Sequence, residues 1–302
     1  MSHSIAEFEF DGLRLLGFSL AGEESFVVLP EANLAFDLGR SPRPVLNVDH
    51  VFLSHGHMDH AAGVAYYFSQ RNFIGNPSGT LYVPAGLEDP IDRLLRVWGE
   101  IDGQQPPAKI VVATPGADVE LRRDLVVRPF QVNHPFRRRG APTIHALGFV
   151  AIETRQKLKD EFQGLEGPQL VEIKKQGVEI TRRVELPLVA YCGDTCPGDF
   201  VELDYVRQAR VLVIECTFFD AEDLPRARAG NHMHVTDLRQ VIPQLDNERI
   251  LLTHLSRRTS VAEARAVLAR ELGPHFDDRR ISFLMEHRAR RRRGPVTGAE
   301  EE

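Results

Sequence analysis

The stretch V-F-L-S-H-G-H-M-D-H-A-A-G, residues 51–63, decides the fold predicted for this chain. Its first apolar residues, Val51 to Leu53, predict a strand, and the run from Ala61 to Phe68 predicts a helix. Four side chains that can bind a metal lie between them: His55, His57, Asp59 and His60. Imidazole and carboxylate groups are ligands of zinc, manganese or iron at hydrolytic centres. Because three of the 12 histidines of the chain lie within six residues beside an aspartate, the stretch indicates a metal site rather than a polar surface loop.

Polar residues also follow later predicted strands, at the point where each strand ends. The residues concerned are His134, Asp194, Glu215 and His254, after the apolar runs 125–130, 186–191, 211–214 and 250–252. Many strands that end at one rim, with helices between them, predict an α/β layered fold with a site at a common edge. There is no internal repeat and no linker, so we expect residues 1–286 to form a single domain.

Two segments depart from this pattern. Residues 155–185 are rich in charge and are interrupted by glycine and proline, so we interpret them as an inserted excursion outside the sheets. Residues 287–302 form a polar tail that we predict to be disordered.

Composition excludes several classes of protein. Hydrophobic residues make up 42% and charged residues 26% of the 302 residues, as in globular proteins with a sizeable core. No apolar run is long enough to cross a membrane, and residues 1–4 lack the layout of a signal peptide. Three cysteines are too few and too scattered for a disulfide framework, and Cys192 and Cys196 are interpreted as small buried residues rather than thiolate ligands. The predicted location is therefore cytoplasmic.

The candidate ligands suffice for two metal ions. We assign His55, His57 and His134 to one ion and Asp59, His60 and His254 to the other, with Asp194 shared. A shared carboxylate holds two metals close together, and a bridging water then becomes a hydroxide that can attack phosphorus. Asp59 could also accept a proton from that water. His145 competes with His134 for the third-ligand position, and we favour His134 because it follows a strand directly.

Glu215 and His234 are the candidates for proton transfer. A carboxylate that holds an imidazole fixes its tautomer and raises its basicity, so His234 could protonate the leaving ribose oxygen. We interpret His232 as a supporting residue on the same face. Asp37 admits two readings, either a carboxylate that orients a ligand or a residue that forms a turn.

These residues resemble the metallo-β-lactamase superfamily, whose signature H-x-H-x-D-H corresponds to residues 55–60. Within it the chain is most similar to ribonuclease Z in its short plant-type form. The similar pieces are A-F-D-L-G-R (35–40), F-Q-V-N-H (130–134), Y-C-G-D-T (191–195), V-I-E-C-T-F (213–218), N-H-M-H-V-T (231–236) and L-L-T-H-L-S-R-R (251–258). The resemblance implies a four-layer αβ/βα sandwich, two Zn²⁺ ions (Mn²⁺ or Fe being compatible with the same ligands), a homodimer, and removal of the 3′ trailer of precursor tRNA. It also implies that the residues matching Glu215 and His234 assist proton transfer.

The departures from that family concern the substrate. Residues 135–144 form an extra loop that carries Arg137, Arg138 and Arg139, which we predict to bind substrate together with Arg258. The long arm that grips tRNA in many members is not recognisable, although residues 155–185 could replace it. The net charge of −6 would suit an alternative, a hydrolase of the same fold that acts on a small phosphodiester or other small ester. A non-catalytic scaffold is disfavoured because no ligand of the signature is missing.

Overall fold

Two seven-stranded sheets face each other in the computed structural model, which describes residues 5–136 and 142–286. In spatial order the first sheet contains β1 (Ala6–Phe10), β2 (Leu13–Leu20), β3 (Glu24–Leu29), β4 (Leu34–Phe36), β5 (His50–Phe52), β6 (Thr80–Pro84) and β7 (Lys109–Ala113). The second contains β14 (Ile281–Phe283), β13 (Arg249–Thr253), β12 (Val211–Glu215), β11 (Thr181–Tyr191), β10 (Leu147–Leu158), β9 (Leu125–Gln131) and β8 (Val119–Arg122). Each sheet therefore comes from one continuous half of the chain.

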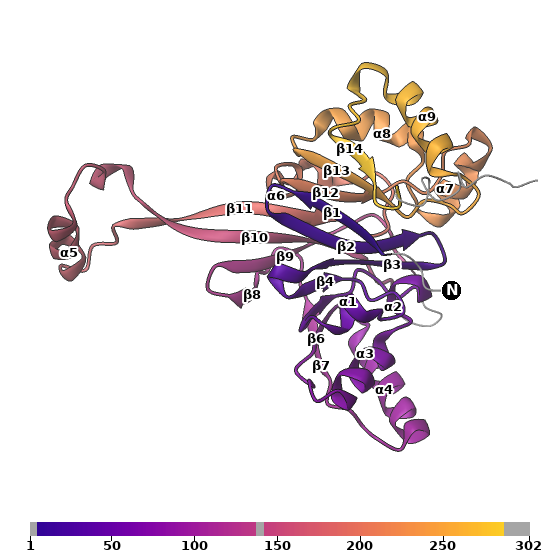
Figure 1. The fold of residues 1–302 in the computed structure, drawn as a ribbon, viewed down its shortest axis with the longest axis horizontal. Helices are drawn as coiled ribbons and strands as arrows, with labels where there is room; N and C mark the ends of the chain where they lie inside the picture. Colours follow the sequence, from indigo (N-terminus) through magenta and orange to yellow (C-terminus); the bar gives the residue numbers. More distant parts are fainter. Residues whose placement is uncertain (1–4, 137–141, 287–302) are drawn as a thin grey trace, which may run out of the picture.

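Helices flank the two sheets, and most lie at the two ends of the body (Figure 1). Beside the first sheet lie α1 (Arg43–Leu46), α2 (Met58–Ala61), α3 (Val64–Phe73) and α4 (Glu88–Asp102). Beside the second lie α6 (Asp204–Arg207), α7 (Leu224–Gly230), α8 (Val235–Val241) and α9 (Val261–Leu272), while α5 (Gly167–Lys175) lies apart. Short 3₁₀ turns are η1 (Pro30–Ala32), η2 (Asp160–Phe162), η3 (Asp199–Glu202), η4 (Ala221–Asp223), η5 (Ile242–Gln244) and η6 (Gly273–His275). This arrangement is the predicted αβ/βα sandwich.

Aromatic side chains join the two sheets at the centre of the core. Phe36 on β4 stacks on Tyr191 of β11 with ring centroids 5.2 Å apart, and Phe52 on β5 contacts Phe149 of β10 at 5.3 Å. All four rings are buried. Burial of large aromatic side chains is a major source of stability, so the sheets are held together close to the edge that carries the polar residues.

Strand direction brings the predicted site residues to one edge. In the first sheet β4, β5 and β6 are parallel, and in the second β11, β12, β13 and β14 are parallel. β9 runs in the same direction as β11 because each is antiparallel to β10. The carboxyl ends of parallel strands meet at the same edge of a sheet, where α/β proteins place their sites.

Residues 155–185 form a long arm rather than an excursion outside the sheets. β10 and β11 stay paired from Phe149 and Tyr191 in the body as far as Leu158 and Thr181, and α5 lies at the far end (Figure 1). The expectation that this segment is not part of a sheet was therefore wrong. The outer part of each strand is exposed on both faces, so it lacks the alternation of apolar and polar residues that marks a strand on a core.

No helix within residues 5–136 and 142–286 is long and apolar enough to span a membrane. The tail that we predict to be disordered lies outside the described residues.

Candidate metal centre

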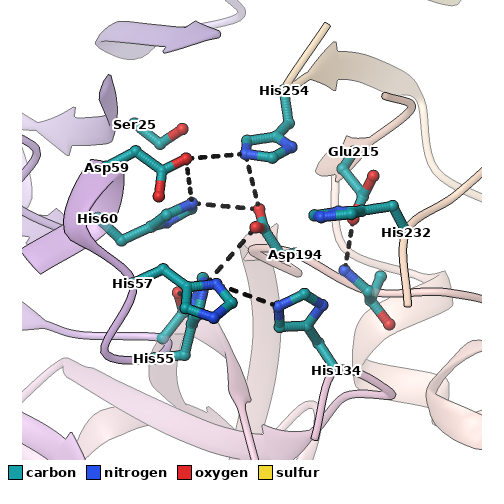
Figure 2. Close-up of polar contacts among 12 residues, drawn as sticks. Ser25, His55, His57, Asp59, His60, His134, Asp194, Glu215, His232 and His254 are labelled. Atoms are coloured by element: carbon teal, nitrogen blue, oxygen red, sulfur yellow. Dashed lines mark hydrogen bonds and ion pairs between the residues drawn. The ribbon is translucent and has the colours of Figure 1, made fainter. Parts of the chain in front are cut away.

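The residues after β5 supply four of the candidate ligands. His55 lies two residues beyond the buried Leu53, in extended backbone that leads to α2, and His57 is the residue that precedes this helix. Asp59 and His60 lie in the first turn of α2, so they face a position next to that of the two earlier histidines (Figure 2). The side chains of His55 and His60 are buried, whereas His57 is exposed at the mouth of the site.

Four ligand atoms converge in a first cluster, formed by His55, His57, His134 and Asp194. The Nε2 atom of His55 lies 3.0 Å from Nδ1 of His57 and 3.6 Å from Oδ2 of Asp194. His134 Nε2 lies 3.4 Å from His57 Nδ1. The structure therefore brings these three histidines to one point, although His134 is separated from the first two by almost eighty residues.

A second cluster contains Asp59, His60 and His254. Asp59 Oδ2 lies 3.3 Å from His254 Nε2 and 3.7 Å from His60 Nε2. Both imidazoles also reach Asp194, whose Oδ1 lies 3.2 Å from His60 Nε2 and 3.4 Å from His254 Nε2 (Figure 2). One oxygen of Asp194 thus faces each cluster, the position that a shared ligand requires.

The donor set fits divalent metal ions. His60 Nε2 and Asp194 Oδ1 are buried and have no hydrogen-bond partner among the described residues, a state that costs free energy unless another group binds there. Burial lowers the pKa of His55, His57 and His134, which keeps the imidazoles neutral, the form that binds a metal. Burial raises the pKa of Asp59, but hydrogen bonding to His254 and the charge of His60 hold it at about 2. Because so acidic a carboxyl is a weak base, metal binding suits Asp59 better than proton acceptance.

Asp37 orients His60. It follows β4 with a φ of +58°, and its Oδ2 accepts hydrogen bonds from His60 Nδ1 at 2.6 Å and from the Tyr191 hydroxyl at 2.6 Å. Its Oδ1 accepts the backbone N–H of Ser54 at 2.7 Å. Such contacts fix which imidazole nitrogen points at the metal position. Of the two readings of Asp37, the structure supports the orienting carboxylate.

Two other histidine ligands are also oriented by a hydrogen bond, which involves the imidazole nitrogen that does not face the metal position. His134 Nδ1 donates to the carbonyl of Asn231 at 2.9 Å, and His254 Nδ1 contacts the hydroxyl of Thr217 at 2.9 Å. His145, the competing candidate, is exposed and contacts Gln131. The structure therefore places His134, and not His145, with the other ligands.

The predicted contact between Glu215 and His234 is wrong. Glu215 is buried at the end of β12, and its Oε1 accepts a hydrogen bond from Nδ1 of His232 at 2.8 Å. His234 instead caps α8 and contacts Thr236 and the carbonyl of Asp220. The sequence from Asn231 to Asp237 indicates this capping role. His234 and Asp237 are three residues apart and form a capping box in which His234 is the N-cap of α8.

His232 lies beside both metal clusters. Its ring stacks on that of His254 with centroids 5.2 Å apart and lies 5.0 Å from that of His134. Burial lowers the pKa of His232, but the Glu215 carboxylate raises it to about 9 overall. A further group of side chains that could hold a metal ion consists of Asp194, Glu215, His232 and His254. His232 is therefore the site residue that the sequence analysis ranked too low.

Of the four predicted substrate-binding arginines, the structure describes only Arg258. Arg258 is exposed, and its guanidinium lies 3.9 Å from the carboxylate of Asp223. Arg137, Arg138 and Arg139 lie outside the described residues. Cys192 is buried and Cys196 is half-buried, and neither belongs to a metal-binding group within the residues described.

Two facing sheets with histidine–carboxylate clusters at one edge define the metallo-β-lactamase fold, and residues 23–147 match the model of the metallo-beta-lactamase superfamily. Among curated proteins, tRNase Z TRZ1 of Arabidopsis thaliana is 33% identical over 260 residues, which cover 84% of this chain and 89% of that protein. The chloroplastic tRNase Z TRZ2 of the same plant is 31% identical over 261 residues, covering 85% and 71%. The chain belongs to the tRNase Z family.

Solved structures agree on the fold. The short form of human tRNase Z has a TM-score of 0.55 at 21% identity, covering 81% of this chain and 92% of that one. Zn²⁺-bound PqqB from Methylobacterium extorquens has a TM-score of 0.56 at 14% identity, covering 88% and 95%. The predicted family and fold are confirmed, and the chain is a metal-dependent hydrolase whose clusters can bind divalent ions.

Proposed function

We propose that this protein is an endoribonuclease that removes the 3′ trailer of precursor tRNA. The observation that carries the proposal is the match to plant tRNase Z over most of both chains, combined with the convergence of all seven predicted ligands. The alternative, a hydrolase of small phosphodiesters, is less favoured because β10 and β11 form an arm that reaches far from the clusters (Figure 1).

The metal centre is proposed to hold two zinc ions, with manganese or iron as chemically acceptable substitutes. His55, His57 and His134 would bind one ion and Asp59, His60 and His254 the other, with Asp194 between them. Bound ions would supply Lewis acidity, which lowers the pKa of water and polarises the phosphodiester. Asp37 and the hydrogen bonds of the other histidines keep the ligands oriented.

Glu215 and His232 are proposed to handle the proton of the leaving group. Burial lowers the pKa of this imidazole, but the Glu215 carboxylate raises it overall, which favours the protonated ring, and the ring lies next to the clusters. His232 can thus donate a proton to the ribose oxygen as the phosphodiester bond breaks, while Glu215 holds the ring in place. This assigns to His232 the role that the sequence suggested for His234.

Positive charge away from the clusters is proposed to hold the RNA. The exposed arm carries several basic side chains, namely Arg155, Lys157, Lys174, Lys175, Arg182 and Arg183. Arg258 and the three arginines at 137–139 remain further candidates for phosphate contacts. Binding through such contacts weakens as salt rises, because each neutralised phosphate releases counterions.

A homodimer is proposed as the working form, in the cytoplasm. The supporting feature is an apolar surface on α3 and α4, which we call the α3–α4 patch and which consists of Tyr66, Phe73, Leu94, Val97, Trp98 and Ile101. The α4 members recur at helical spacing along one side of the helix, next to the stripe formed by the buried Ile91 and Leu95. Large apolar side chains that are exposed along one side of a helix are typical of protein interfaces.

The test is incubation of the purified, metal-loaded protein with a precursor tRNA that has a 3′ extension. We expect a single endonucleolytic cut that yields tRNA with a free 3′-hydroxyl group, mapped by sequencing of the products. Asp194→Ala serves as the inactive control. An intact precursor, together with rapid hydrolysis of a small chromogenic phosphodiester, would replace this proposal with the small-substrate alternative.

A further inference from the structure

A cavity of about 660 Å³ lies outside the two metal clusters, at the junction of β9 with the segment that contains η3 and α6. Its floor includes the buried rings of Phe130 and Phe200, and the half-buried Tyr205 forms one side. Gln131, Asn133 and Asp199 form a polar rim. The volume falls in the range of pockets that bind small organic groups.

The cavity shares its wall with the loops that carry two metal ligands. Asn133 directly precedes His134, and its backbone N–H donates to the hydroxyl of Thr195, which directly follows Asp194, at 3.0 Å. The backbone N–H of Cys196 donates to the carbonyl of Asn133 at 3.1 Å. A group bound in the cavity would therefore lie beside the segment that positions the catalytic centre.

The opposite side of the cavity reaches the base of the arm. The guanidinium of Arg128 lies 5.2 Å from the centre of the Tyr205 ring, and it also donates to Glu185 on β11 at 2.9 Å. β9 and α6 both lie where the arm leaves the body (Figure 1). An RNA strand that runs from the arm to the metal clusters would thus pass the cavity.

The rim offers mainly hydrogen-bond acceptors. The amide nitrogen of Asn133 donates to the carbonyl of Pro197 at 2.8 Å, and that of Gln131 contacts His145, which leaves the two amide oxygens available. Asp199 is exposed and has no hydrogen bond or ion pair with another described residue. Its negative charge disfavours a phosphate group, whereas an apolar floor with acceptors at the rim suits a flat ring that carries an amino group.

We propose that this cavity binds a nucleobase with an exocyclic amino group, in preference to uracil, from the RNA strand next to the cleaved phosphodiester. The base packs on the floor formed by Phe130, Phe200 and Tyr205, and its amino group donates to Asp199 and an amide oxygen of the rim. This inference rests on the proposed endoribonuclease function, because it specifies which part of the RNA the site recognises. It gives the protein a base preference close to the cut.

The first test measures kcat/KM for precursors that differ only in the nucleotides flanking the cut. The wild type should cleave precursors with an amino-bearing base at one of these positions about tenfold faster than those with uracil, as one hydrogen bond to a charged group allows. In Asp199→Asn the preference should fall to less than about threefold, because the amide has half the acceptor capacity and no charge. Asp204→Asn, which removes an exposed charge from the neighbouring helix, should keep the preference.

Turnover of a small chromogenic phosphodiester should be equal in the three proteins, since the cavity is not part of the metal clusters. A wild type without base preference at any flanking position would overturn the inference, as would a preference that survives Asp199→Asn.

A second measurement does not depend on cleavage. Oligoribonucleotides with 5-iodocytidine at the same positions should, on irradiation, form adducts with the peptide that contains Tyr205. If the precursor is not cleaved, the proposed function fails, but this adduct still decides the occupancy of the cavity. Adducts found only on other peptides would refute base binding there, whatever the activity.

Discussion

Asp194 is the residue on which both metal clusters depend. Its two oxygens face different groups of histidines, and one of them has no hydrogen-bond partner among the described residues. We predict that Asp194→Ala, folded as judged by circular dichroism, contains far less metal than the wild type when measured by mass spectrometry of the metal. Asp199→Asn is the matched control and should keep its metal. Full metal content in Asp194→Ala would contradict the shared position.

The two histidines 232 and 234 give a direct comparison of roles. His232→Ala should retain its metal but lose about 10²-fold to 10⁴-fold in kcat, the usual contribution of a general acid. His234→Ala should keep its catalytic rate and lose about 1 kcal/mol of stability, because it removes the cap of α8. The measurements are single-turnover cleavage, metal content and urea unfolding. Loss of metal from His232→Ala would make His232 a ligand instead of a proton donor.

Most ligands could be found from the sequence because each follows a strand within a few residues. The sequence does not indicate whether Glu215 contacts His232 or His234. Both histidines lie on an extended segment and differ only in the residues that they contact. The three-dimensional structure shows only which imidazole Glu215 contacts, namely that of His232, seventeen positions away in the sequence. The capping pattern around α8 was the available clue.

At the scale of elements, the base of the arm is held by an ion-pair network. Arg128 on β9 donates to Asp118 at 2.7 Å and to Glu185 on β11 at 2.9 Å, and its guanidinium is largely covered. We predict that Arg128→Met raises KM for precursor tRNA while kcat for a small chromogenic phosphodiester is unchanged, because the arm loses its fixed direction. Arg122→Met is the control, since Arg122 on β8 pairs with the nearby Asp124 and not with a residue of the arm. Equal KM values for the two variants would contradict an anchoring role.

A buried arginine joins α3 to the loop before β5. The guanidinium of Arg71 donates to the carbonyl of Val48 and pairs with Asp49. Burial raises the pKa of Asp49, but hydrogen bonds from Asn33 and Ser78 and the charge of Arg71 lower it below its ordinary value. A lowered carboxyl pKa contributes stability that is present above the unfolded pKa and is lost as pH falls through the folded pKa.

Asp49→Asn should therefore lower the free energy of unfolding by about 2 kcal/mol at pH 7, where the wild-type pair is charged. This difference should begin to shrink below about pH 4, where Asp49 of the unfolded chain becomes protonated, and should shrink further as the pH falls through the lower pKa of the folded protein. Urea unfolding of the two proteins at several pH values measures it. A difference that stays constant down to pH 3 would show that charge is not its cause.

The arm was the element least accessible to sequence analysis. A strand is recognised by alternating apolar and polar residues, and that alternation arises from burial on one face. The outer parts of β10 and β11 have no such burial, whereas β9 and β12 pack on the core and were predicted close to their observed bounds. The helix signals within the arm are Pro168 and the capping box of Glu166 and Gln169 at the start of α5, and the sequence analysis did not use them.

At the scale of the whole molecule, the α3–α4 patch predicts self-association. Val97 and Trp98 are 53% and 45% exposed although both are apolar. The double substitution Val97→Glu, Trp98→Glu should convert a dimer to a monomer in light-scattering chromatography, because charged residues at an apolar interface are costly. Val171→Glu, which also replaces an exposed apolar residue but on the arm, should leave the dimer intact. A wild type that is monomeric at micromolar concentration would refute the proposal.

The order of the sheets along the chain has a consequence for protein synthesis. The segment that forms the first sheet contributes the four residues around His55, and the segment that forms the second sheet contributes His134, Asp194 and His254. A nascent polypeptide that has not yet left the ribosome as far as His254 has the strands of the first sheet, but it lacks a complete second sheet and a finished pair of clusters. A growing chain is thus unable to cut the RNA that surrounds it, and competence arises only after His254 has been made and folded.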